Sequence, residues 1–115
     1  MDRAAKRLQK ISERDQRLDY LHSIYPELKA IDEAIAANGR AMLQATAEGR
    51  RQDLVRLERR QDEILLQQQQ FLEKVGLDTS IYEIQWDCPL CQDRGYISPG
   101  QKCQCLISEI RQSRL

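Results

Sequence analysis

The sequence predicts a mainly α-helical protein: a long antiparallel helical hairpin or three-helix coiled-coil arm, then a small four-cysteine module and a short C-terminal helix. Three observations predict this fold class. Apolar residues recur at steps of three, four or seven over residues 1 to 75, which is the spacing of one helix face. All four cysteines fall between residues 88 and 105. Aromatic residues make up only 5% of the 115 residues, so the core must be thin. We therefore expect two domains, a helical coiled-coil arm over 1–75 and a cysteine module with a terminal helix over 76–115.

Three helices are expected in the arm. The first should cover 2–24, because the residue before Pro26 is disfavoured in the α conformation. Pro26 suits the first position of a second helix, over 26–48. Gly49 marks a turn into a third helix, over 50–74. Because the second and third helices are each about 35 Å long at about 1.5 Å per residue, we expect them to pair as an antiparallel hairpin.

Polar residues interrupt the apolar seam of this hairpin at Asn38, Gln61 and Gln68. A buried polar residue at such a position fixes the register of two helices and costs stability. The run of glutamines at 67–70 is interpreted as solvated helix surface and not as a ladder of paired glutamines. The single histidine, His22, is interpreted as an ordinary surface or boundary residue, neither ligand nor base.

The first helix carries an apolar stripe that has two interpretations. Its members are Leu8, Ile11, Leu18 and Leu21. Such a stripe at helical spacing can dock into a groove on a partner protein. It can equally close a three-helix bundle, and the sequence leaves both interpretations open.

The four cysteines have the spacing of a metal site. Cys88-Pro-Leu-Cys91 and Cys103-Gln-Cys105 form the pattern C-x2-C-x11-C-x-C, and the eleven residues between the pairs are enough for a hairpin that brings the pairs together. Clustered cysteines in a cytosolic chain favour a metal over disulfides. We predict a zinc-ribbon-like module in which Cys88, Cys91, Cys103 and Cys105 hold one structural Zn²⁺ and leave no open coordination position. An iron–sulfur cluster would use the same ligands and stays an alternative.

Residues near the cysteines have predicted supporting roles. Four thiolates around Zn²⁺ leave a formal charge of minus two, which backbone N–H groups, Arg94 and Lys102 are expected to offset. Metal binding is expected to supply the folding free energy that a short tail with little apolar content lacks. Trp86, directly upstream of Cys88, is expected to pack the tail against the helices.

Composition excludes several functions. Eighteen Lys and Arg balance eighteen Asp and Glu, so direct nucleic-acid binding should be weak or absent, since phosphate neutralisation needs a surplus of base. No stretch reaches the roughly 20 apolar residues of a membrane span, and the N-terminus has no apolar segment like that of a signal peptide; we expect a cytoplasmic protein. No Gly-x4-Gly-Lys-Ser/Thr motif and no candidate catalytic residue occur, so the chain by itself is not expected to be an enzyme.

The tail carries a family resemblance. It reads Cys88-Pro-Leu-Cys91-Gln-Asp93-Arg94-Gly95-Tyr96-Ile97 and then Lys102-Cys103-Gln-Cys105-Leu106. This resembles the C-x-x-C-x-D-T-G-Y…C-x-C-L signature in the N-terminal region of DnaC/DnaI-type replicative helicase loaders. Upstream, the second helix opens like the same region of that family, with Tyr25-Pro26-Glu27-Leu28 followed by Ile31-Asp32 and Ile35. Two departures stand out: Arg94 occupies a position where the family usually has threonine, and the chain stops at Leu115 without the family's AAA+ ATPase module.

The resemblance implies a docking role on the hexameric replicative helicase, with ATP hydrolysis left to an AAA+ module of a full-length protein. One alternative is a DksA-type coiled-coil zinc-finger transcription regulator, which would insert its hairpin tip into RNA polymerase. That mechanism needs an acidic tip, whereas the tip at 48–53 is mixed. A zinc-dependent nucleic-acid clamp would rely on arginines of the third helix that are interleaved with acids, namely Arg50, Arg51, Arg56, Arg59 and Arg60.

Overall fold

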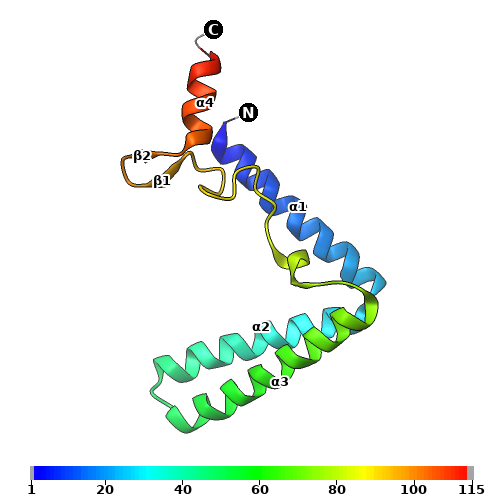
Figure 1. The fold of residues 1–115 in the computed structure, drawn as a ribbon. Helices are drawn as coiled ribbons and strands as arrows, with labels where there is room; N and C mark the ends of the chain where they lie inside the picture. Colours follow the sequence, from blue (N-terminus) through cyan, green and yellow to red (C-terminus); the bar gives the residue numbers. More distant parts are fainter. Residues whose placement is uncertain (1, 114–115) are drawn as a thin grey trace. The chain divides into compact units, whose positions relative to one another are not determined.

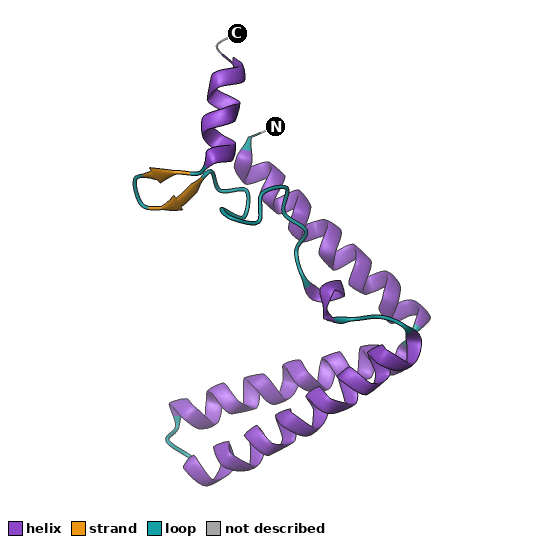
Figure 2. Ribbon diagram, in the orientation of Figure 1, coloured by secondary structure: helices purple, strands orange, loops and turns teal. Residues whose placement is uncertain are grey.

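The computed structural model describes residues 2–113 and is mainly helical (Figure 1, Figure 2). Its elements are, in chain order, α1 (Arg3–Ile24), α2 (Pro26–Ala47), α3 (Arg51–Val75), the short 3₁₀ helix η1 (Thr79–Tyr82), β1 (Tyr96–Ser98), β2 (Gln101–Lys102) and α4 (Gln104–Ser113). The predicted fold class is therefore confirmed: a long helical hairpin, a small cysteine module and a short C-terminal helix. Among the described helices, none is both long enough and apolar enough to cross a membrane.

The helices α2 and α3 form the predicted antiparallel hairpin (Figure 1). Pro26 occupies the start of α2, and Gly49, at φ +69°, makes the turn between the two helices. Both helices contribute buried side chains: Leu28, Ile31, Asn38 and Ala45 from α2, with Ile64, Phe71 and Leu72 from α3. Burial of the apolar side chains among these stabilises the hairpin.

Two polar contacts sit within this seam. Asn38 is only 9% exposed, and its Nδ2 donates to the backbone oxygen of Leu57 at 2.9 Å and to Oε1 of Gln61 at 2.8 Å. Further along, Asp32 accepts from Nε2 of Gln68 at 2.9 Å and lies 2.6 Å from Nε2 of His22. Each polar side chain inside the seam is thus matched to a polar partner, so a shift in register would leave buried groups unpaired.

The chain divides into two compact units. One contains the residues up to Arg17 together with those from Tyr82 onward, and the other spans Leu18–Ile81. This division differs from the predicted ranges 1–75 and 76–115, because the first half of α1 packs along the cysteine segment. Of the stripe predicted on α1, Leu21 is buried in the hairpin unit, whereas Leu8 is 68% exposed.

Candidate metal centre

The four cysteines converge as predicted. Their sulfur atoms all lie within 4.8 Å of one another, and none is in a disulfide. The Sγ atoms of Cys88 and Cys103 are 3.6 Å apart, and those of Cys91 and Cys105 are 3.5 Å apart. A tetrahedron with metal–sulfur bonds of about 2.3 Å has edges of about 3.8 Å, so the spacing fits a single ion. The structure therefore brings together a four-cysteine set that can hold a metal ion.

Three local elements position these sulfurs. Cys88 and Cys91 flank a tight turn, Cys103 follows β2, and Cys105 lies in the first turn of α4. The hairpin of β1 and β2 is closed at its base by the N–H of Cys103, which donates to the oxygen of Gly95 at 2.7 Å. This hydrogen bond returns the second cysteine pair to the first, as the eleven-residue spacing predicted.

Asp93 holds the first pair in place. Its side chain is 1% exposed, and its carboxylate accepts from the backbone N–H of Asp87 at 3.1 Å and of Cys88 at 2.8 Å. Asp93 itself is in the left-handed region at φ +59°, which Asp tolerates better than most residues. A buried carboxylate with two backbone donors is expensive to replace, so Asp93 is a structural residue of the site.

The pKa values of Cys91 and Cys105 are shifted in opposite directions. Burial raises the pKa of Cys91, but the N–H of Gly95, 3.4 Å from its sulfur, and the neighbouring thiols outweigh this and lower that pKa to about 6. At Cys105, burial and the three other sulfurs raise the pKa to about 12. The cluster therefore resists carrying four negative charges by itself, and a divalent cation would resolve the conflict.

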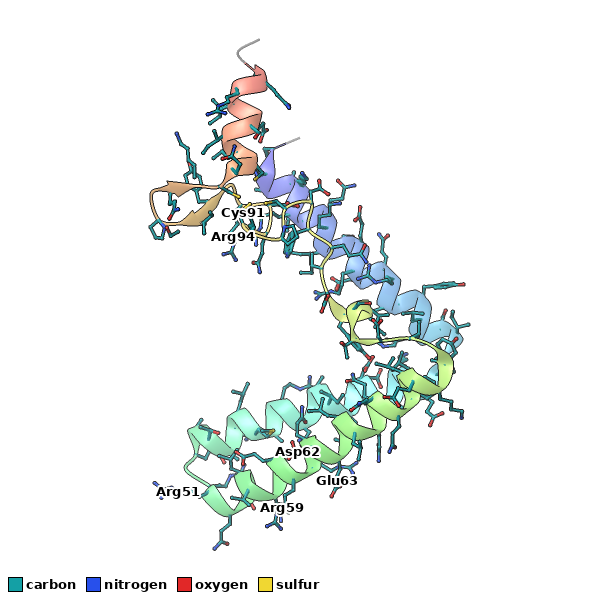
Figure 3. All side chains as sticks on the ribbon, in the orientation of Figure 1. Arg51, Arg59, Asp62, Glu63, Cys91 and Arg94 are labelled. Carbon is teal, nitrogen blue, oxygen red and sulfur yellow. The ribbon has the colours of Figure 1, made fainter. Side chains whose placement is uncertain are left out.

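A cation that contacts the cluster comes from the N-terminal helix and was not foreseen. Arg94 and Lys102, the predicted compensating cations, are both exposed (Arg94 and Cys91 are labelled in Figure 3). Instead Nη1 and Nη2 of Arg3 each lie 3.9 Å from the sulfur of Cys105. Arg3 and Cys105 are 102 positions apart along the chain, so the local sequence around the cysteines does not reveal this contact.

Arg3 begins a stripe of basic residues on α1 that contacts the segment around the cysteines. Lys6 and Lys10 both pair with the carboxylate of Asp87, and their hydrogen bonds hold its pKa below the usual value. Three arginines of the stripe donate hydrogen bonds to backbone oxygens: Arg7 to Gln92, Arg14 to Tyr82 and Arg17 to Glu83. The guanidinium of Arg7 also lies over the ring of Trp86. The stripe repeats at steps of three or four, so the sequence does show that one face of α1 is basic, but this signal does not identify what that face contacts.

Trp86 packs against the helix, as predicted. The guanidinium carbon of Arg7 lies 5.2 Å from the centre of its ring, a cation–π distance. The tail is thus joined to α1 by both an aromatic contact and charged groups.

Searches against protein-family models, curated proteins and solved structures find no match to this chain.

Proposed function

We propose that this chain is a protein-interaction domain built around one structural Zn²⁺, and that it docks on a hexameric replicative DNA helicase as the N-terminal domain of a helicase loader. The observation that carries the proposal is the four-sulfur cluster, formed by a motif that resembles the loader signature. ATP hydrolysis would belong to an AAA+ module of a full-length protein, and such a protein would act in the cytoplasm.

The geometry supports a structural metal. Four cysteine sulfurs complete a tetrahedral coordination shell, so a Zn²⁺ held there has no position for water or substrate. Cys91 and Cys103 are 4% and 1% exposed, whereas Cys88 and Cys105 are half-buried, so solvent is excluded from one side of the cluster. A site whose four ligands are all protein sulfurs has no open position for a substrate, which is why we assign the metal a structural role and not a catalytic one.

The residues that carry the resemblance have physical roles in this structure, which supports its use. Asp93 accepts two backbone N–H groups at the first cysteine pair. Gly95 is at φ +91°, a conformation that favours glycine. Arg94, which departs from the family pattern, is exposed, so the departure leaves the sulfurs undisturbed.

A docking role is supported by apolar side chains that remain at the surface of the cysteine module. Leu90 is 77% exposed, Ile97 is 53% exposed and Tyr96 is 48% exposed. Tyrosine is among the residue types that contribute most of the binding energy at interfaces, and exposed aliphatic side chains add apolar area that a partner can bury. The DksA-type alternative has less support, since the acidic groups near the hairpin tip, Glu48 and Asp53, both pair with Arg50.

The metal is tested by elemental analysis of protein purified under reducing conditions. We expect one zinc per chain, and none in Cys91→Ser. Iron with visible absorbance, or no metal at all, would overturn the zinc assignment.

Docking is tested by pull-down with the purified replicative helicase. We expect the zinc-loaded chain to bind and Cys91→Ser to bind weakly, while Arg59→Ala, an exposed residue of α3 labelled in Figure 3, serves as the matched control. Absence of binding by the zinc-loaded chain would refute the loader assignment.

A further inference from the structure

We infer that Arg3 is an outer-sphere component of the metal centre, so that metal binding at the cysteines and attachment of the first turns of α1 are coupled. This inference rests on the proposed zinc site. It assigns a role to the start of α1 that neither the cysteine spacing nor the docking proposal requires.

The contacts of Arg3 converge on one corner of the site. Both terminal nitrogens of Arg3 lie 3.9 Å from Sγ of Cys105. In addition, Nη1 is 3.5 Å from the backbone oxygen of Asp93, and Nη2 is 2.6 Å from Oε2 of Glu109. A guanidinium has five donors in one plane and can serve a sulfur, a carbonyl and a carboxylate together. A lysine ammonium has the same charge but cannot span these three acceptors in the same way.

The backbone leaves room for this side chain. A Cβ added at Gly95 would lie 3.1 Å from Nε of Arg3 and 3.3 Å from its Cδ and Cζ. Glycine at residue 95 is favoured by its positive φ, and any Cβ there would require the Arg3 side chain to move by a few tenths of an ångström. The guanidinium of Arg3 thus packs closely against the backbone of the cysteine module.

The positive charge of Arg3 explains how its contact with Cys105 would favour metal binding. A Zn²⁺ with four thiolates carries a formal charge of minus two, and a cation close to one sulfur lowers the free energy of that state. Cys91 already has a backbone donor, the N–H of Gly95. Arg3 supplies the corresponding donor to Cys105, and it brings a full positive charge.

Coupling to the helix follows from where the next contacts fall. Arg7 donates to the oxygen of Gln92, one residue after Cys91, and Lys6 pairs with Asp87, one residue before Cys88. Metal binding fixes the turn that contains both of these partners. By linkage, a metal that orders the turn strengthens attachment of α1, and attachment of α1 strengthens metal binding by the same factor.

The test compares Arg3→Gln with Arg17→Gln as a matched control. Arg17 lies on the same helix and also contacts the tail, but its hydrogen bond is to the backbone oxygen of Glu83, five residues before the first cysteine. Zinc affinity is measured by competition with a chromogenic chelator. We expect Arg3→Gln to lose about tenfold or more in zinc affinity, as outer-sphere substitutions at metal sites do, and Arg17→Gln to change it by less than about twofold.

Two further measurements separate an effect on the sulfur from a general loss of packing. In the Co²⁺-substituted protein the sulfur-to-metal charge-transfer band should shift in Arg3→Gln and not in Arg17→Gln. Hydrogen exchange at residues 3–10 should accelerate when a chelator removes zinc from the wild-type chain. Arg3→Lys provides a second variant if Arg3→Gln folds poorly: it keeps the charge and should show an intermediate loss of affinity.

The possible results are distinguishable. Zinc affinity and a cobalt spectrum in Arg3→Gln equal to those of the wild type would overturn this inference and leave the zinc proposal intact. Unchanged exchange at residues 3–10 after chelation would overturn the coupling. A wild-type chain that binds neither zinc nor cobalt would overturn the zinc proposal and this inference with it.

Discussion

Replacing Asn38 by alanine should destabilise the hairpin of α2 and α3 by about 1–3 kcal/mol. Asn38 is 9% exposed and donates two hydrogen bonds, at 2.9 Å to the oxygen of Leu57 and at 2.8 Å to Oε1 of Gln61. Each such bond contributes about 0.5–1.5 kcal/mol net, and removing the donor leaves Gln61 with an unpaired, partly buried acceptor. The loss is therefore larger than for an exposed polar residue of the same helix, such as Gln44.

The assay is urea denaturation of the zinc-loaded chain, followed by far-ultraviolet circular dichroism. A double-mutant cycle with Gln61→Ala isolates the pair, and we expect a coupling free energy of about 1 kcal/mol. Gln44→Ala, the control, should change the free energy of unfolding by less than about 0.5 kcal/mol. Additive effects of Asn38→Ala and Gln61→Ala, or a cost for Asn38→Ala no larger than the control, would refute the role that we give to this contact.

Three other substitutions test the site and the core. Gly95→Ala combines an unfavourable φ of +91° with a Cβ 3.1 Å from Arg3, so it should weaken zinc binding in a chelator competition; unchanged affinity would contradict the close approach described above. Asp93→Ala removes the acceptor of two backbone N–H groups and should cost the cysteine module about 1–3 kcal/mol, seen as faster hydrogen exchange at Asp87 and Cys88. Ile64→Ala, at a position 2% exposed, should lower the free energy of unfolding by about 2–5 kcal/mol, whereas Leu66→Ala, 55% exposed, should change it by less than about 1 kcal/mol. Equal costs at these two positions would show that the buried face of α3 has been misassigned.

The sequence was sufficient to predict the helices and the cysteine cluster because both depend on short-range patterns. Apolar spacing, Pro26 and Gly49 placed the helices within one or two residues of their observed ends. The spacing of the cysteines predicted that the two pairs meet, since eleven residues are enough for a short hairpin between them. Asn38 and Gln61 were predicted in the seam by the same periodicity.

The attachment of α1 to the cysteine segment could not be predicted in this way. Its contacts join residues that are 66 to 106 positions apart. A row of basic residues on a helix usually indicates a solvated face, and nothing local distinguishes Arg3 from other surface arginines. Arg94 and Lys102 were chosen as compensating cations because they are close in sequence, although proximity along the chain does not determine which charge reaches a sulfur.

The contact between Arg3 and Cys105, separated by 102 positions, also has a consequence for the order of folding. Bringing such distant residues together requires closing a loop of nearly the whole chain, at an entropic cost that grows with loop length. The pairing of α2 with α3 needs only the closure of a short turn, and contacts of that kind form early. The hairpin should therefore form first and shorten the loop that remains, so that capture of the metal and seating of α1 complete the folding reaction.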